Sequence, residues 1–480
     1  MTPTAPGTQV TIRDEALARF AAQDTAAWFV TGFTDKGPTG VPTPIRSLSE
    51  FVDVFGDKVA WSTLYDALDV YFREGGGLAY VSRVVGPNPV AATANLLDQS
   101  GSSVPGDVAL TITATEYGAS LNGLKFEVTA GGGNFVIIVS DADGVLETSD
   151  TLADRTAAVA FGDESDLVNI ALGASNEDPR AQGPTSLAGG TDDHTNATET
   201  EWADALEAIT KDYGAGQVSA PGRTTATTQL ALAAHAATFN RMAIVDLEDT
   251  AVVADLVTDV DALRDSDYAR NAAAFAPWVT VPGETAGTTR TVAPSAVVAA
   301  LIARSQALGN SPNVPAAGRN GQASYVTGLS QVAFSEADRG TLNDGSVNII
   351  RELSGEFRVY GYRTTVDPTD QPEWRELGGA RTAMAIAAEA EAIGEEFVFA
   401  EIDGNGKKIG EFGGRLGAVC LGYYNQGALY GATPDEAFFV DVGPTVNTAE
   451  TIDDGKLLAR IELATSPAAE RVEITVVKTS

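Results

Sequence analysis

The sequence predicts a multidomain protein of mixed α/β class, with a β-rich inserted domain and extended arms near both ends. Three observations support this prediction. The 480 residues exceed the length of roughly 250 to 300 residues at which a single hydrophobic core stops growing. Stretches of helical and of strand-like apolar spacing alternate over most of the chain, as in α/β proteins. Between Val108 and Ile170, apolar residues occupy every second position between turn residues, which indicates strands.

The N-terminal segment, residues 1–24, is predicted to be an extended arm. It contains Pro3, Pro6 and Gly7, followed by the alternating pair Val10 and Ile12. Residues 25–104 are predicted to form the first part of an α/β core. Its expected elements are a buried strand at Ala27–Phe33, a short helix capped by Ser47 and Glu50, a second helix with Leu64, Leu68 and Tyr71 on one face, and a strand at Leu78–Val85.

Residues 105–186 are predicted to form an all-β inserted domain. Within it, Asp141-Ala142-Asp143-Gly144 has the spacing of the start of a calcium loop. It lacks the third oxygen ligand before the glycine and the terminal glutamate that such a loop needs. A hairpin turn is therefore the favoured interpretation, because Asp-Gly between two apolar runs is a common turn signal.

Residues 187–345 return to alternating helices and strands and are predicted to form a middle α/β domain. Residues 346–465 are predicted to form a C-terminal α/β domain, and residues 466–480 a strand-like arm. The expected elements of the middle domain are a helix bearing Trp202, Leu206 and Ile209, a strand at Met242–Leu247, a helix at Leu256–Leu263 and an alanine-rich helix after Pro294-Ser295. Those of the C-terminal part are strands at Phe357–Tyr362, Phe397–Glu401, Ala437–Val442 and Leu457–Leu463, and helices at Arg381–Ile393 and around Ile409–Val419.

The composition excludes several classes of function. The formal charge of -34 repels nucleic-acid phosphates and anionic lipids, so a large charged partner is expected to be basic. This acidity fits a high-G+C genome or a high-salt cytoplasm. Residues 1–10 lack the features of a secretory signal, and the apolar run Ala296–Ala303 is too short for a membrane span, so we expect assembly in the cytoplasm without membrane insertion.

No constellation for catalysis or metal binding is evident. A triad would have to use His194 or His235, and neither adjoins a nucleophile motif; Ser295 reads only as a helix cap. The single Cys420 lies in an apolar stretch and is expected to be a small buried hydrophobe. Gly404–Lys408 lacks the spacing of a phosphate loop and is expected to be a surface hairpin or a helix start. We therefore expect no enzyme activity, no metal and no cofactor.

Several segments, in order along nearly the whole chain, resemble the tail sheath proteins of contractile phages and related injection systems. The N-terminal segments are Thr25–Pro38, Ser49–Phe51 with Phe55-Gly56, Tyr71–Gly76 and Ala79–Val85. Glu116–Leu124 resembles the element that opens the family's inserted domain, and Leu187–Asp192 the one that closes it. The later segments are Ala276–Val279, Pro294-Ser295, Leu342–Arg351, Val359–Thr364, Glu373–Arg375 and Gly427–Val440. Val314–Ala317 matches the family only loosely.

This resemblance implies a structural subunit that polymerises as stacked six-fold rings around an inner tube. Contraction from a metastable extended state would drive the tube through a target cell envelope. The implied partners are further copies of the chain, the inner tail tube protein, and baseplate and tail terminator proteins. The implied location is the tail sheath of a virion or a cytoplasmic contractile injection particle. The resemblance also implies a middle domain that is subtilisin-like in fold only, a C-terminal domain against the tube, and an inserted domain facing outward.

The terminal arms are predicted to exchange strands between subunits. An isolated strand has unpaired backbone N–H and C=O groups and buries too little surface area to be stable alone. It should therefore add to a sheet edge of a neighbouring subunit. The residues predicted to take part are Val10, Ile12, Val472, Ile474 and Val476. A final hairpin folded back after Pro467 within the same chain is the alternative. Two other functions stay open: a hydrolase on a subtilisin-like scaffold, and a carbohydrate-binding surface protein that uses the β-rich insertion.

Overall fold

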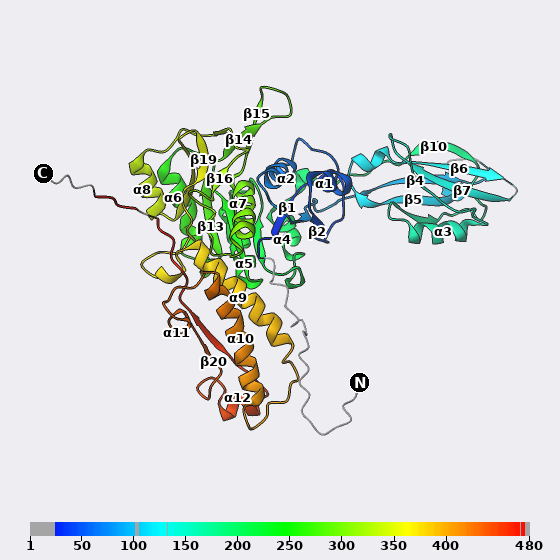
Figure 1. Ribbon diagram of the computed structural model, residues 1–480. Coiled ribbons are helices and arrows are strands. Elements are labelled where there is room, and N and C mark those ends of the chain that lie inside the picture. The colour runs from blue at the N-terminus through cyan, green and yellow to red at the C-terminus, as the bar shows by residue number, and fades with distance from the viewer. Residues whose placement is uncertain (1–24, 101–104, 132, 471, 476–480) are drawn as a thin grey trace, which may run out of the picture.

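The computed structural model describes residues 25–100, 105–131, 133–470 and 472–475. Figure 1 shows three parts: a central body, a β-rich lobe that extends from one side of it, and a helical lower lobe beneath it. The described residues contain no helix that is both long enough and apolar enough to cross a bilayer. Val10 and Ile12 lie outside the described residues.

A large mixed sheet forms the centre of the body. Its strands are β1 (Trp28–Gly32), β2 (Thr43–Ile45), β3 (Ala79–Arg83), β11 (Gly216–Ser219), β12 (Arg241–Asp246), β13 (Ala272–Ala276), β16 (Gln322–Ala323), β18 (Val347–Leu353) and β19 (Glu356–Val359). Their order is β16-β19-β18-β13-β12-β11-β1-β3-β2. The six inner strands from β18 to β3 run parallel, and β2, β19 and β16 pair antiparallel at the edges. The central strands are buried on both faces, as expected for a parallel sheet covered by helices.

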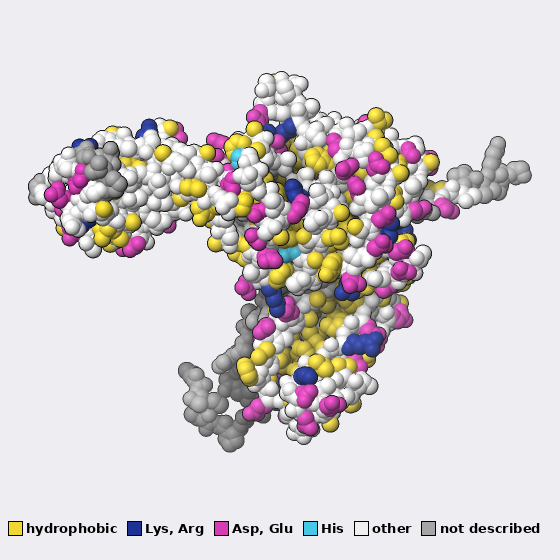
Figure 2. Space-filling view, turned by 180° about the vertical axis from the view of Figure 1, so that it is seen from behind, with side chains coloured by type: hydrophobic (Ala, Val, Ile, Leu, Met, Phe, Trp, Pro, Cys, Tyr) yellow, Lys and Arg dark blue, Asp and Glu magenta, His cyan; other side chains and the backbone are white. Residues whose placement is uncertain are grey.

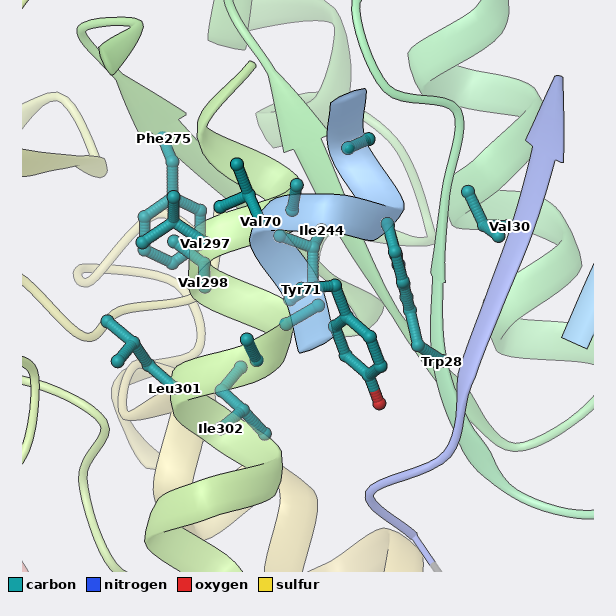
Figure 3. Packing of buried hydrophobic residues seen from close by; sticks show 14 of the residues in the cluster. Trp28, Val30, Val70, Tyr71, Ile244, Phe275, Val297, Val298, Leu301 and Ile302 are labelled. Carbon is teal, nitrogen blue, oxygen red and sulfur yellow. The ribbon is translucent and has the colours of Figure 1, made fainter. Parts of the chain in front are cut away.

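Helices cover both faces of this sheet. One face carries α1 (Leu48–Phe55), α2 (Leu64–Arg73) and α7 (Pro294–Gly309); the other carries α4 (Glu199–Glu207), α5 (Ala226–Thr238), α6 (Val253–Arg264) and α8 (Glu336–Asp344). Figure 3 shows the first face, where Trp28, Ile244 and Phe275 from three strands meet Tyr71 of α2 and Val297 of α7. Successive strand residues alternate between the two cores, so the body is a three-layer α/β sandwich.

Helix α7 lies at the centre of this core, and its burial pattern and first residue fit that position. Its residues are buried almost all round from Pro294 to Ser305, the pattern of a helix enclosed in a core. Pro294 occupies the first helical turn, where a missing N–H costs nothing. A small sheet of β14 (Val279–Pro282), β15 (Thr289–Val292) and β17 (Gly328–Leu329) flanks this helix.

The β-rich lobe is a sandwich of two antiparallel sheets. One contains β4 (Ala91–Leu97), β5 (Val108–Tyr117) and β9 (Val168–Leu172); the other contains β6 (Lys125–Gly131), β7 (Asn134–Ser140), β8 (Val145–Thr148) and β10 (Gln182–Ser186). Apolar residues of both sheets form one core between them. Asp141–Gly144 is the turn between β7 and β8: the Asp141 carboxylate accepts from the N–H groups of Asp143 and Gly144. The hairpin interpretation of that motif is confirmed.

The lower lobe consists of two long antiparallel helices backed by a narrow hairpin. Its elements are α9 (Leu377–Glu395), α10 (Lys407–Asn425), α11 (Pro434–Ala437), β20 (Phe438–Asp441), α12 (Ala449–Asp453) and β21 (Arg460–Leu463). β20 and β21 pair only with each other in the described part of the chain. Cys420 is fully buried between the helices, and burial raises the pKa of its thiol to about 11, which confirms its role as a buried hydrophobe.

Two predicted elements were wrong. Phe397–Glu401 is a turn between α9 and α10 and not a strand, because Phe397 packs against Phe412 while Phe399 takes a φ of 62° and is fully exposed. The inserted region is not all-β, because helix α3 (Arg155–Glu164) covers β9 there. Asp154 caps α3 by accepting from Ala157 N–H, a local signal that strand periodicity alone had hidden.

Strand pairing also bears on the expected division of the chain. β4 precedes residue 105, yet it pairs with β5 in the β-rich lobe. β18 and β19 follow residue 346, yet β18 pairs with β13 in the central sheet.

Ser47 caps α1 as predicted by accepting from Glu50 N–H, but the Glu50 carboxylate accepts from the Arg46 N–H and not from Ser47. The capping box at that helix is therefore only half formed.

Candidate assembly site

The lower lobe has a sheet that is too narrow for the helices it should cover. Packed helices lie about 8–10 Å apart, whereas neighbouring strands are separated by about 4.8 Å. β20 packs on α10, and no described strand continues the sheet from β21 over α9. The outer edge of β21 therefore offers backbone N–H and C=O groups at a position where another strand would complete the layer.

An apolar groove of about 310 Å³ runs beside that edge. Its walls are Ile461, Leu463 and Thr465 on one side, and Gly379, Ala383, Ile386 and Ala387 of α9 on the other. Glu373 and Trp374, in the 3-10 turn Pro372–Trp374, close one end. In Figure 2, hydrophobic side chains gather where the lower lobe meets the central body. Small residues on the facing side of α9 leave room for the side chains of an added strand.

The C-terminal segment supplies a candidate strand. Val472 and Ile474 are 78% and 81% exposed, and residues 472–475 make no hydrogen bond to any other described residue. These two predicted exchange residues alternate with the exposed Glu473, which is the spacing of a strand with one apolar face. Val476, the third predicted residue of this arm, lies outside the described residues. In Figure 1 the segment leads away from the body.

The first residues of the predicted C-terminal arm are held by contacts within the chain. Ser466 N–H donates to the Ala428 carbonyl at 2.9 Å, and the Ala468 N–H donates to the Glu376 carboxylate at 3.0 Å. Glu470 forms ion pairs with Arg363 and Arg375. Residues 466–470 therefore contact the rest of the described chain, although the sequence analysis places them in the arm.

The side chains that a hydrolase would need are not brought together. The Ser295 hydroxyl donates to the Asp246 carboxylate at 2.8 Å, and that carboxylate also accepts from the Ser295 and Gly222 N–H groups. His194 pairs with Asp192 at 2.7 Å, and His235 contacts Arg241 at 2.7 Å. Within the described chain, Ser295 contacts neither histidine. Asp246 and Ser295 instead fix the start of α7, His235 packs beside β12, and His194 stacks on Trp61.

Burial perturbs two of these groups in opposite directions. Burial, together with the nearby Arg241 charge, lowers the pKa of His235 from 6.5 to about 3. Burial raises the pKa of Asp246 from 3.8 to about 6, although hydrogen bonds from Gly222 and Ser295 act to lower it. Burial is the main cause of both pKa shifts, and neither side chain lines the groove between α9 and β21.

Acidification from pH 7 to pH 4 is expected to cost the central body roughly 3 kcal/mol at His235. Its folded pKa is depressed, so the unfolded chain binds the proton first and stability is lost as the pH falls below 6.5. Chemical unfolding followed by tryptophan fluorescence gives the free energy of unfolding of the native protein and of His235→Gln, which keeps an acceptor for Arg241. The difference between these two free energies should change by this amount between pH 7 and pH 4. Asp246 has the opposite sign, since its stabilisation is lost as the pH rises through about 6, and it cancels in this comparison. A difference in unfolding free energy that stays constant from pH 7 to pH 4 would contradict the lowered pKa of His235.

The remaining candidate motifs are structural. Gly406 is the N-cap of α10, and the Asp403 carboxylate accepts from the N–H groups of Lys407 and Lys408, so this helix start is already capped. The helix-start interpretation of Gly404–Lys408 is confirmed. No group of three or more potential metal-binding side chains occurs among the described residues.

Solved structures with the same architecture identify the fold. No protein-family model and no curated protein matches the amino-acid sequence. The sheath tail protein of Listeria innocua is similar with a TM-score of 0.64 and 14% identity, over 87% of this chain and 89% of that one. The sheath tail protein of Desulfitobacterium hafniense gives 0.60 and 12%, over 91% and 93%. The contracted helical sheath of the anti-feeding prophage gives 0.57 and 18%, over 99% and 100%. The chain has the fold of the contractile tail sheath proteins over nearly its whole length.

Proposed function

We propose that this chain is a structural sheath subunit of a contractile tail or injection particle. Copies stack as six-fold rings around an inner tube and contract from a metastable extended state, which drives the tube through a target cell envelope. The observation that carries this proposal is a narrow sheet and an exposed segment with strand-like alternation in one chain that has the sheath fold. The work of contraction comes from new contacts between subunits, so no enzyme activity and no cofactor is needed.

The polymer is held together by strand exchange. Residues 472–476 of one subunit add to the outer edge of β21 in another, with Val472 and Ile474 directed into the groove beside Ile461 and Leu463. The backbone bonds supply affinity that does not depend on sequence, and the two apolar side chains fix the register. Val10 and Ile12 of the N-terminal arm supply a further exchanged strand. Subunits so joined can move against each other without separating.

We also propose how the chain divides into functional parts. The arm at 1–24, the core part 25–104, the insertion 105–186, the middle part 187–345, the C-terminal part 346–465 and the arm from 466 are the divisions suggested by the sequence. Strand pairing supports moving the start of the insertion to β4, and keeping β18 and β19 with the middle part. The lower lobe then faces the inner tube, and the insertion faces outward.

The partners follow from this arrangement. We infer contacts with further copies, the inner tube protein, and baseplate and terminator proteins, without nucleic-acid binding or membrane insertion. The particle assembles in the cytoplasm as a virion tail sheath or an injection-system sheath. Acidic side chains are spread over all three parts in Figure 2, which supports a more basic surface on the tube. Contacts of this kind weaken as salt is raised.

Negative-stain electron microscopy of the purified chain at several salt concentrations tests the proposal. Long, hollow, helically striated tubes are the expected result. Monodisperse particles at every salt concentration, with and without a tube protein, would contradict the proposal that the chain polymerises.

A further inference from the structure

The root of the C-terminal arm is attached to its own subunit at three residues, Ser466, Ala468 and Glu470. The Asn313 side-chain amide donates to the Ser466 carbonyl at 3.1 Å, and the Ala468 N–H donates to Glu376 at 3.0 Å. The third contact is made by the Glu470 carboxylate, which lies between two arginines. The attachment thus involves the loop after α7, the start of α9 and the segment that follows β19.

Arg363 forms the fixed side of the third contact. Its side chain is only 4% exposed. Its backbone N–H donates to Asn348 Oδ1 at 2.7 Å, and its backbone carbonyl accepts from the same amide at 2.8 Å. Its Nη1 donates to the Asn343 carbonyl at 2.7 Å. The Arg363 backbone is therefore fixed by Asn348, and its nearly buried guanidinium is restricted by Asn343 independently of Glu470.

Glu470 uses the edge of Arg363 that these bonds leave available. Arg363 Nε donates to Glu470 Oε1 at 2.8 Å, and Nη2 donates to Oε2, so the pair is bidentate. Arg375 adds a third bond to Oε2 at 3.2 Å from the exposed side. A bidentate pair on a preorganised arginine fixes direction as well as position. We call Glu470, Arg363 and Arg375 the arm anchor.

The chain changes character immediately after the arm anchor. Residues 472–475 are exposed and make no hydrogen bond within the described chain. Glu470 is thus the last described residue that is held before the segment with strand-like alternation. The direction of that segment is set by how the backbone leaves Glu470.

We propose that the arm anchor is a positioning device that aims the exchanged strand at one particular neighbour. This inference rests on the strand exchange proposed above. An arm with a fixed exit direction samples few orientations before it finds its acceptor edge, so less conformational entropy is lost on assembly. Loss of the arm anchor would leave the strand and the groove intact. Pairing between the strand and its acceptor edge would, however, be slower and less selective for one neighbour.

The first test uses the unassembled subunit, so it does not depend on polymer formation. Spin labels at Ile474→Cys and Glu336→Cys report the spread of distances between the arm and α8, while the buried Cys420 stays unlabelled. The native anchor is expected to give a narrow distribution, and Glu470→Gln one at least about twice as wide, because the bidentate charge pair is lost. Glu352→Gln, the same change at an exposed glutamate of β18 outside the arm and the groove, is the matched control and should stay narrow. Equal widths for Glu470→Gln and the control would overturn the arm anchor.

The second test measures the fraction of the same variants that sediments as tubes. Glu470→Gln is expected to reduce this fraction by about tenfold through lost preorganisation, whereas Glu352→Gln, outside the exchanged strand and the groove, leaves it unchanged. Arg375→Gln removes only the exposed partner and guards against misfolding around Arg363; it should give an intermediate result. A broad distance distribution with a normal yield of tubes would overturn the positioning role. If the native chain forms no tubes, the sheath proposal fails, while the distance measurement still decides the arm anchor.

Discussion

Deletion of residues 471–480 is expected to abolish tube formation and to leave the folded subunit intact. The deletion removes Val472 and Ile474, which make no contact that stabilises their own subunit, and keeps the arm anchor at Glu470. The thermal unfolding temperature should therefore stay within about a degree or two of the native value, since surface changes of this kind alter stability little. Sedimentation and electron microscopy measure the polymer, and scanning calorimetry measures the fold.

A longer deletion, of residues 466–480, separates the two roles of this segment. It also removes Glu470 and leaves Arg363 nearly buried without its carboxylate, which should lower stability by roughly 2 kcal/mol. This figure lies below the range for fully buried pairs, because Glu470 itself is about one-third exposed. Tubes of normal length from the shorter deletion would rule out this arm as the exchanged strand.

Ala387→Trp is expected to reduce tube formation as strongly as removal of the arm, although the arm itself is unchanged. Ala387 lies on the exposed side of α9 and lines the groove beside β21. An indole there occupies the space intended for Val472 or Ile474, so the incoming strand cannot approach the sheet edge. The yield of sedimenting tubes, relative to the native chain at equal concentration, measures the effect.

Ala387→Ser is the control for this substitution, because it changes the same exposed position without filling the groove. Both variants should unfold at the native temperature, since neither disturbs a buried side chain. If the tryptophan variant assembles as well as the serine variant, the groove is not the acceptor, and the β20 edge becomes the alternative position for the C-terminal strand.

Much of the central body could be predicted because local and tertiary preferences agree there. The apolar run of β1 is long enough only for a strand, and Leu64, Leu68 and Tyr71 repeat at helical spacing in α2. The prediction was wrong at Phe397–Glu401, where a short apolar run with good strand residues forms a turn. The decisive fact there is tertiary: α9 and α10 must reverse direction, and packing of Phe397 on Phe412 fixes the reversal.

The candidate site was only half predictable. Alternation of Val472, Glu473 and Ile474 past Pro467 is visible in the sequence and indicates an isolated strand. The groove is not visible, because its walls come from α9 and β21, which are about 80 residues apart in the chain. The arm anchor is hidden for the same reason, since Arg363 and Glu470 are 107 positions apart. Charged residues at such separations give no local signal of pairing.

Mixed subunits that each carry one added cysteine beside the buried Cys420 test the central claim of strand exchange most directly. If Val472 and Ile474 enter the groove, Glu473 points outward on the same face as Glu462 of β21, because side chains alternate along a strand. Subunits with Glu473→Cys are mixed with subunits with Glu462→Cys, assembled and oxidised. The account predicts a disulfide-linked dimer that contains one subunit of each kind, formed only in tubes. Tubes that form without this dimer, or a chain carrying both cysteines that closes the bond as a monomer, would contradict it.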